Sequence, residues 1–411
     1  MKRLNITLAA LLLGAAPALA EDLVVFQNWS SPAEVAALEV LHKAVAAKGI
    51  NWIDVTIPHD TGSSVSLLNL VAGEQPPNIF SENNSGVYRD LTQLGLGRDL
   101  KDALTESGAM AHFPPVVQQA ITIDGEVRKV PLGVHIDGMV YYNLEVAAKA
   151  GVDPAKWDSL DAMFADFDKI KAAGFVPLAI GAQQWQIGYL FHALTATVAG
   201  PAVYNDFYGP APTDATIDSA ELRQTLEWLR KFQSVADEAS VNRDWNMTTN
   251  EVISGKALMQ IHGDWMKGEW RAAGKEAGKD FGCLPIPGAK AVPVTVDGWG
   301  ALGGQSAEKD AAEMLFIQTV VEAQVNADFV LAKGASPVRD DVPTENLDIC
   351  AKLVKDLLQK PDYQVANPSI TVDADWSNAV WTVVFNFWSD PNMSVDDAVA
   401  QLHEQRAQIF D

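Results

Sequence analysis

Apolar positions along the chain follow two alternating patterns. Residues 23–29, "LVVFQNW", form a short continuous apolar run that predicts a buried strand, whereas residues 31–49 repeat apolar positions with helical spacing. Ser31 is placed to cap that helix and Gly49 to end it. The next elements expected are a strand at residues 51–58 and, at residues 63–80, a helix that leads into a third strand. Strands that alternate with helices of this length predict a parallel or mixed α/β sheet.

This alternation is interrupted three times. Residues 130–143 predict a strand pair, after which the chain becomes mainly helical, including residues 250–274. Residues 283–304 return to a strand-like pattern rich in Pro and Gly, and helices resume after residues 333–343. Such changes predict two lobes built from discontinuous segments, with several crossings between them that form a hinge. The expected parts are a signal peptide at 1–20, a first α/β lobe at 21–132 plus about 289–340, and a second, more helical lobe at 133–288 plus about 341–411.

The first residues have the order of a secretory signal. Lys2 and Arg3 precede a short apolar run, and Ala18 to Ala20 supply small residues before a predicted cleavage at Glu21. This run is too short for a membrane span, which needs about 18 apolar residues. We therefore expect an exported, soluble, periplasmic chain.

Charge and cysteine content narrow the function further. The formal charge of −23 repels nucleic acid and anionic lipid, so neither is expected as a partner. Two cysteines, Cys283 and Cys350, permit either one disulfide or two buried thiols in an oxidising compartment. No histidine has metal-ligand spacing to either cysteine, so we expect no metal and no other cofactor.

The common enzyme motifs do not occur: the chain contains no HExxH, GxSxG or GxxxxGK[ST] sequence, and no GxGxxG sequence after a predicted strand. What recurs instead is tryptophan beside amide and acid residues in the predicted loops. A neutral sugar suits this inventory, because its C–H faces pack on aromatic rings while its hydroxyls need donors and acceptors. Loop residues of this kind that we expect to contact a ligand are Asn28, Trp29, Glu34, Asp60, Asn84, Trp245, Trp265, Asp297 and Trp376. His135, Asp137 and Lys333 are further candidates, although His135 could be structural and Lys333 simply exposed.

The order of several stretches resembles the extracellular solute-binding subunits of ATP-driven carbohydrate importers, most closely their glucose/mannose-binding branch. The stretches are "NWSSPAE", "LVAGEQPPNIF", "VPLGVHIDGMVYYN", "AGFVPLAIGAQQWQ", "RDWN", "GKALMQIHGDWMKGEW", "GKDFGCLPIPG", "VDGWGALG" and "KGASPVR". The resemblance implies a two-lobe periplasmic binding protein fold of type II-like form, a sugar held between the lobes, delivery to a membrane permease, and a monomer. It also implies that Cys283 and Cys350 form a structural pair.

Carried over by position, the resemblance implies roles for five residues. Trp29 and Glu34 would contact sugar from the first lobe, Trp265 would stack from the second, Asp297 would hold hydroxyls, and Lys333 would bind a ring substituent.

The chain departs from the branch at several positions. It has Asn28 where a second tryptophan is usual, Asn84 nearest an expected lysine, and Asp137 within "HIDG" in place of "H-R-x-N". Thr295 replaces an asparagine, and an expected C-terminal histidine is missing from "TVDADWSNAV". The sequence therefore predicts a neutral carbohydrate or polyol other than simple glucose, such as a pentose, a glycoside or a short oligosaccharide. Two alternatives stay open: a periplasmic carbohydrate-active enzyme (glycosidase or lyase), and the same scaffold binding a polyamine.

Overall fold

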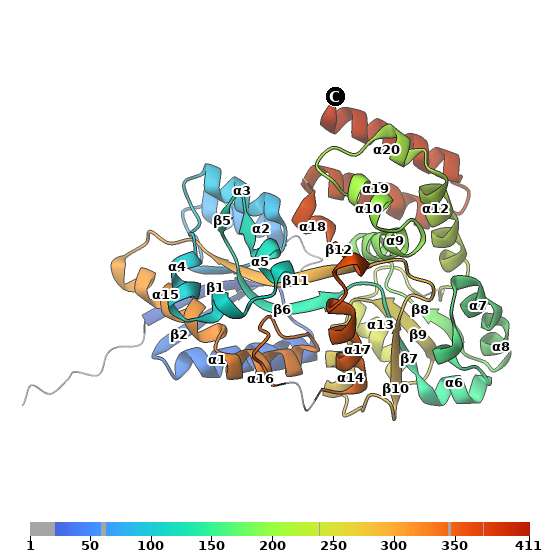
Figure 1. Cartoon of the computed structure of the whole chain (residues 1–411), viewed down its shortest axis with the longest axis horizontal. Coiled ribbons are helices and arrows are strands. Elements are labelled where there is room, and N and C mark those ends of the chain that lie inside the picture. Colours follow the sequence, from blue (N-terminus) through green and yellow to red (C-terminus); the bar gives the residue numbers. More distant parts are fainter. Residues whose placement is uncertain (1–20, 59–62, 238, 344–346, 373) are drawn as a thin grey trace, which may run out of the picture.

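The structure is a computed structural model, and it describes residues 21–58, 63–237, 239–343, 347–372 and 374–411 (Figure 1). The predicted signal peptide at 1–20 and the candidate Asp60 lie outside the described residues.

The larger of two principal sheets contains strands from widely separated parts of the chain. Its members are β1 (Glu21–Gln27), β2 (Ile50–Thr56), β3 (Ile79–Ser81), β6 (Val130–Ile136), β11 (Val292–Ala301) and β12 (Gln364–Ala366). The order is β12-β11-β3-β1-β2, and β6 also pairs with β11. Strand β1 is parallel to β2 and β3, whereas β11 is antiparallel to β3 and β6. The mixed sheet expected from the alternating pattern is therefore present.

The smaller sheet consists of β7 (Met139–Asn143), β8 (Val176–Ala179), β9 (Ala257–His262) and β10 (Phe281–Pro285), in the order β10-β7-β9-β8. Strand β9 corrects the helical prediction for residues 250–274. All six of its residues are buried, and a short strand buried on both faces has no polar alternation to distinguish it from a buried helix. A small hairpin, β4 (Thr122–Ile123) with β5 (Glu126–Val127), pairs separately.

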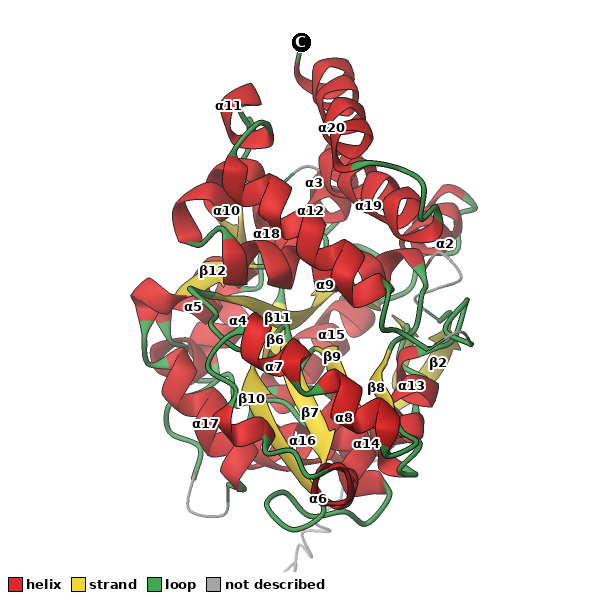
Figure 2. Ribbon diagram, turned by 90° about the vertical axis from the view of Figure 1, so that its right-hand side faces the viewer, coloured by secondary structure: helices red, strands yellow, loops and turns green. Residues whose placement is uncertain are grey.

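Helices surround both sheets (Figure 2). The helices that precede β6 in the sequence, or that lie between β11 and residue 333, are α1 (Pro32–Ala46), α2 (Ser63–Ala72), α3 (Ser85–Gln93), α4 (Lys101–Glu106), α5 (Pro115–Ile121), α15 (Ala307–Val320) and α16 (Ala323–Lys333). The others are α6 (Leu144–Ala150), α7 (Leu160–Ala165), α8 (Phe167–Ala172), α9 (Gln184–Val198), α10 (Pro201–Phe207), α11 (Asp214–Ile217), α12 (Ala220–Gln233), α13 (Trp245–Ile253), α14 (Met266–Ala272), α17 (Ile349–Leu358), α18 (Pro368–Thr371), α19 (Ala374–Ser389) and α20 (Val395–Phe410). Short 3₁₀ turns occupy Ala109–His112, Pro154–Lys156 and Pro361–Tyr363.

Helix α1 illustrates how the local sequence sets this framework. Ser31 accepts a hydrogen bond from the Glu34 backbone N–H, and the Glu34 carboxylate accepts one from the Ser31 N–H, which completes a capping box. Ala37, Leu41 and Val45 turn one apolar stripe of the helix into the core. Gly49 then takes the left-handed conformation (φ 84°) that starts β2.

The chain passes from one sheet to the other directly after β6. Strand β6 runs unbroken across the expected lobe boundary at residue 132, and β7 begins at Met139 in the other sheet. We therefore propose that the crossing lies between Ile136 and Met139, with Gly138 (φ 74°) at the turn. A disulfide joins Cys283 of β10 to Cys350 of α17, so the cysteines are paired, as the family resemblance implied.

Among the described residues, no single helix is long and apolar enough to cross a membrane. One pair bent by 70°, α15 with α16, meets the criteria of length and composition only when its two helices are taken together.

Candidate functional site

A buried acid–imidazole–acid group links the two sheets. His135 of β6 places Nδ1 2.6 Å from Asp264 Oδ1 and Nε2 3.1 Å from Asp297 Oδ2. Asp297 lies in β11 of the larger sheet, whereas Asp264 follows β9 of the smaller one. The three side chains are 0%, 2% and 11% exposed, so this contact between the sheets is shielded from water.

The charges in this group support one another. Burial by itself favours the neutral imidazole, but the carboxylates of Asp264 and Asp297 outweigh it and raise the pKa of His135 to about 9. Burial likewise opposes ionisation of Asp297, yet His135 and Lys333 hold the pKa of its carboxyl well below the usual range. At neutral pH the group is therefore an imidazolium between two carboxylates.

Lys333, the last residue of α16, brings further predicted residues to this group. Its ammonium Nζ lies 3.7 Å from Glu34 Oε1 and 3.9 Å from Asp297 Oδ2. The same nitrogen lies 5.1 Å from the ring centroid of Trp29 and 5.8 Å from that of Trp265, within cation–π range of both. Lys333 is buried rather than exposed, and it connects residues from both sides of the group.

Glu34 and Trp29, which the sequence predicted as ligand contacts, both have structural roles. Glu34 Oε2 accepts hydrogen bonds from the backbone N–H groups of Ser30 and Ser31, at 3.0 Å each. The other carboxylate oxygen, Oε1, faces Lys333. Trp29 is 7% exposed and packs 5.2 Å from Trp299 in the core of the larger sheet. Either residue can reach a ligand only through a small part of its surface.

The loop after β3 adds amide groups beside Asp297. Asn83 donates from Nδ2 to Asp297 Oδ1 at 3.0 Å and accepts from the Gly298 N–H at 3.1 Å. Lys129 donates to the Asn83 carbonyl at 2.7 Å, and burial lowers the pKa of this lysine to about 8. Asn84, the predicted contact, instead caps α3 by accepting from the Gly86 N–H at 2.8 Å. Asn83 is therefore the better placed of the two amides.

Asn28 is half-buried, and its Oδ1 accepts from the Ser81 hydroxyl at 3.4 Å. The contact holds Asn28 between the ends of β1 and β3, at the strand edge where the sequence predicted ligand contacts.

Aromatic rings gather on the other side of the His135 group, and we call them the aromatic face: Trp185, Tyr189, Trp245, His262, Trp265 and Trp381. Trp185 and Tyr189 are four residues apart on α9 and point to one side of it, with ring centroids 5.6 Å apart. Trp265 and Trp381 lie 5.9 and 6.1 Å from the Tyr189 ring, and Trp265 packs edge-on against His135 at 5.3 Å. Trp185, Tyr189, Trp245 and Trp381 are only half-buried, so the face keeps exposed ring surface.

His262 supplies a hydrogen-bond donor within this face. Its Nδ1 accepts from the Gly263 N–H at 2.8 Å, which in a neutral ring leaves the proton on Nε2. Burial, and then nearby His192, lower the pKa of His262 to about 3, so the ring is neutral. Among the described residues His262 Nε2 is buried without a hydrogen-bond partner, and so is the Trp381 indole nitrogen.

Asp137 and Tyr189 both contact His192. Its Oδ2 accepts from His192 at 3.1 Å, Thr295 at 2.9 Å and Asn367 at 2.8 Å, whereas Oδ1 has no partner among the described residues. Burial, and then the Asp137 carboxylate, raise the pKa of the Tyr189 phenol well above its usual range. The carboxylates of Asp297 and Glu82 act in the same direction.

The structure thus brings most of the predicted residues to one region. His135, Lys333, Asp297, Trp265, Glu34 and Trp29 form one contact network, and Trp245 joins the aromatic face 6.3 Å from the His262 ring. Trp376 does not belong there: it is fully buried, and its indole N–H donates to the Phe207 carbonyl at 2.8 Å. Its polar neighbours belong to the start of α19, a helix whose inward side the tryptophan occupies.

Sequence reasoning did not select Tyr189 or His262. A signal was available for Tyr189, because Trp185 and Tyr189 have helical i, i+4 spacing in "QWQIGY". His262 had none, since it closes a strand that the sequence suggested was helical.

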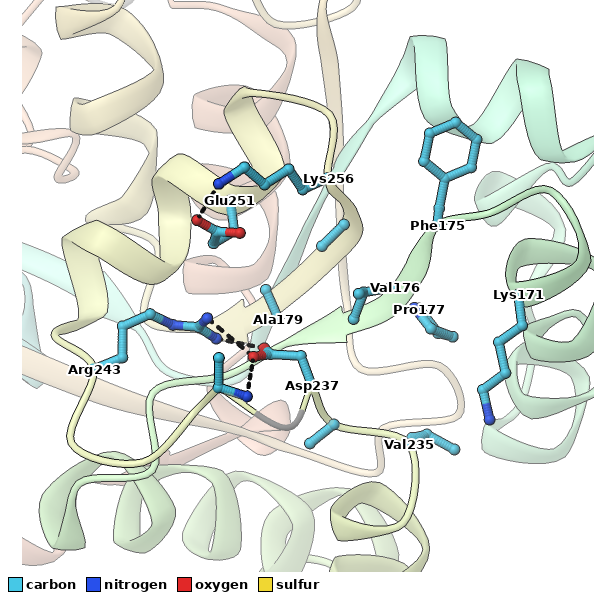
Figure 3. A pocket seen from close by; sticks show the side chains of 13 residues that line it. Lys171, Phe175, Val176, Pro177, Ala179, Val235, Asp237, Arg243, Glu251 and Lys256 are labelled. Carbon is cyan, nitrogen blue, oxygen red and sulfur yellow. Dashed lines mark hydrogen bonds and ion pairs between the residues drawn. The ribbon is translucent and has the colours of Figure 1, made fainter.

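Two cavities lie outside the His135 group, and one of them has Trp29 of this network in its lining. One, of about 530 Å³, borders β8 and is drawn in Figure 3; the other, of about 290 Å³, lies beside α1 and the ends of β1 and β2. Neither has His135, Asp297 or Trp265 in its lining. Within the described ranges one group could hold a metal ion by geometry, His112 with Asp340 and Asp341, and it is mostly exposed and separate from the site.

Two sheets joined by crossing strands, with polar and aromatic residues gathered between them, define a two-lobe binding protein. The chain belongs to the bacterial extracellular solute-binding proteins, whose family model matches residues 25–356. A "probable sugar-binding periplasmic protein" of Brucella melitensis biotype 1 is 30% identical, with 96% of this chain and 94% of that protein covered. One of the same name from Rhizobium meliloti is 31% identical over 85% of this chain and 84% of its own.

Solved structures confirm the fold. A chitin oligosaccharide binding protein superimposes with a TM-score of 0.81 at 18% identity, covering 94% of this chain and 99% of its own. A bacterial solute receptor with exclusive preference for β-D-galactopyranose has a TM-score of 0.80 at 17% identity, covering 95% and 100%. The two-lobe periplasmic binding protein fold predicted from the sequence is therefore confirmed.

Proposed function

We propose that this protein binds a neutral carbohydrate or polyol between its lobes and delivers it to an ABC-type permease. The observation that carries the proposal is the aromatic face: half-buried rings around the His262 Nε2–H, which has no partner among the described residues, with Trp265 packed on the His135 ring that contacts Asp297. A sugar would lay its C–H faces on Trp185 and Tyr189 and offer a hydroxyl oxygen to His262.

The larger sheet would supply the opposite half of the site. Asp297 would accept from a hydroxyl while His135 and Lys333 keep its carboxylate ionised, and Asn83 would offer its amide. Because His135 already ties Asp264 to Asp297, the ligand would bind on a contact that the lobes make by themselves, and its bonds to both sides would favour closure.

The relatives and structural neighbours support a sugar, and they differ in which sugar they name. Relatives are called sugar-binding, and structural neighbours are described with chitin oligosaccharides, galactose or tagatose. For this chain we propose a sugar other than simple glucose, because Asn28 replaces a tryptophan of the branch that it resembles, and Asp137 adds a carboxylate. Trp376, buried in the core, is not part of the proposed site.

We propose binding without turnover, in keeping with relatives that are solute-binding proteins. The permease would then be the physiological partner, reached by the closed form of the two lobes.

The test is calorimetry and tryptophan fluorescence of the full chain against hexoses, pentoses, polyols, disaccharides, glycosides and spermidine. The expected result is a saturable response to one neutral sugar that changes little between low and high salt. A response to spermidine alone, weakened by salt, would replace the sugar with a cation. Conversion of a glycoside during prolonged incubation would replace binding with catalysis.

A further inference from the structure

The groove of about 530 Å³ beside β8 contains two ion pairs (Figure 3). Arg243 pairs with Asp237 through both carboxylate oxygens, and Lys256 pairs with Glu251 at 2.9 Å. Asp237 is 13% exposed and Arg243 11%, so the first pair is mostly buried, whereas Lys256 is 66% exposed. One groove therefore holds two ion pairs of very different burial.

The guanidinium of Arg243 fastens three separate segments. Besides Asp237, it donates from Nη2 to the Ile180 carbonyl at 2.6 Å and from Nε to the Thr248 hydroxyl at 3.2 Å. These contacts join the end of the β8 region, the segment after α12, and the first turn of α13. A planar fork with several donors in fixed directions can hold such a junction, whereas a point charge cannot.

Hydrogen bonds also connect this junction to the aromatic face. Gln186 donates from Nε2 to the Arg243 backbone carbonyl at 2.9 Å and to Gln183 Oε1 at 2.7 Å. Gln183 accepts in turn from the Trp185 indole N–H at 2.9 Å and donates to Asp244 Oδ1 at 2.8 Å. A continuous run of hydrogen bonds thus leads from the groove pair to the ring of Trp185.

Close packing at Gly181 makes this junction stiff. A Cβ atom there would fall well inside contact distance of the Arg243 carbonyl and of both polar atoms of the Gln186 amide. The turn that leads from β8 into α9 therefore has no room to shift unless Arg243 or Gln186 moves as well.

From these contacts we infer that the Asp237–Arg243 pair is a positioning device for the sugar site, and that it sets the orientation of Trp185 through Gln186 and Gln183. The inference rests on the proposed function. Asp237 and Arg243 are positioning residues, because they contact the groups that hold Trp185 and would not touch the sugar. The side chains of the Glu251–Lys256 pair share the groove but make no hydrogen bond to this network within the described part of the chain, which makes the pair a matched control.

The experiment compares Asp237→Asn with Glu251→Gln, using the neutral sugar to which the full wild-type chain responds best. Asp237→Asn keeps the size of the side chain but replaces one acceptor with an NH₂ group that cannot accept from the guanidinium. We expect its Kd to rise about tenfold, equivalent to about 1.4 kcal/mol, and the Trp185 component of the fluorescence response to shrink. Glu251→Gln should leave Kd within about twofold.

A double-mutant cycle separates positioning from general loosening. In a Trp185→Phe background, Asp237→Asn should lose most of its effect on Kd. The phenyl ring has no indole N–H through which the network could orient it. Undiminished weakening in that background would overturn the inference, and so would equal Kd values for Asp237→Asn and Glu251→Gln. If wild type binds no sugar at all, the proposed function fails instead.

Arg243→Lys is the second variant, for use if Asp237→Asn fails to fold. It retains the positive charge opposite Asp237 but removes the fork that also reaches the Ile180 carbonyl. A folded Arg243→Lys protein with wild-type Kd and wild-type discrimination between sugars would overturn the inference.

Discussion

The chain contains two tryptophan clusters that differ in what surrounds the rings. In the larger sheet, Trp299 is fully buried, lies 5.2 Å from Trp29 and 5.6 Å from Trp52, and stacks with Phe316 at 6.2 Å. In the aromatic face, Trp185, Trp245 and Trp381 are half-buried and are grouped with Tyr189 and histidines. The first cluster fills a core, and the second presents ring surface.

This contrast shows which feature distinguishes a binding tryptophan from a packing one. An indole N–H without a partner does not, because the Trp299 and Trp381 nitrogens are both buried and unpartnered among the described residues. Polar neighbours in the sequence do not either, since Trp29 follows Asn28 and is nevertheless part of the core. Several half-buried rings gathered together, as Trp185, Tyr189 and Trp381 are, form the feature that the two clusters do not share.

The largest expected effect comes from Trp299→Ala. Removing this fully buried ring should lower the free energy of unfolding by about 3–5 kcal/mol, because the neighbouring rings cannot collapse into the cavity. Urea denaturation measures the loss. Sugar affinity of the folded fraction should stay near wild type, and a large change in Kd would show that the core cluster also takes part in binding.

A second effect concerns the group that joins the two regions, and it depends on pH. The pKa of His135 is raised from 6.5 to about 9, so its stabilising contribution is complete below about pH 6.5 and is lost as the pH rises through 9. The contribution is about 3 kcal/mol. Urea denaturation at pH 6 and at pH 9.5 gives the free energy of unfolding of wild type and of His135→Gln. The difference between the two proteins should be smaller at pH 9.5 by this amount.

The variant has to be subtracted from wild type because other buried groups titrate in the same pH range. Burial raises the pKa of Glu313 to about 7 and lowers that of Lys129 to about 8. The contributions of these two groups to stability are common to wild type and variant. A difference that is flat from pH 6 to pH 9.5 would mean that folding leaves the pKa of His135 unshifted.

The sequence was sufficient for the general architecture. Strand β1 and helix α1 have the periodicity and caps that their residues indicate, since each depends on its own neighbours. Strand β9 could not be predicted in the same way, because its six buried residues owe their conformation to β7 and β8 on either side. The error at Ala257–His262, within the predicted helical stretch 250–274, therefore reflects tertiary pairing that overrides local pattern.

The site was predictable only in part, and for a related reason. Asp297, Lys333 and Trp265 were selected from polar or aromatic neighbours and from the family resemblance, and the structure brings them together. Whether the ring of Trp376 or of Tyr189 faces the site depends on which side of its helix packs on the core. That side is decided by residues distant in sequence, such as Phe207 for Trp376.

A third prediction tests the aromatic face itself. Tyr189→Ala should weaken sugar binding by about 1.5–2 kcal/mol, more than tenfold in Kd, because a ring at the centre of the face is lost. Tyr189→Phe should lose much less, as the ring surface remains. Calorimetry with both variants separates ring contact from the hydroxyl, and equal losses would assign the interaction to the hydroxyl instead.

The smallest effect is expected at Trp376, which the sequence suggested as a sugar contact and the structure places in the core. Trp376→Phe removes the hydrogen bond to the Phe207 carbonyl and should lower the free energy of unfolding by about 1 kcal/mol, with Kd for sugar unchanged. Thermal denaturation and calorimetry on the same preparation measure both quantities. A Kd raised by an amount comparable to that of Tyr189→Ala would erase the distinction between buried and exposed rings, because a ring with no exposed surface would then be acting as a ligand contact.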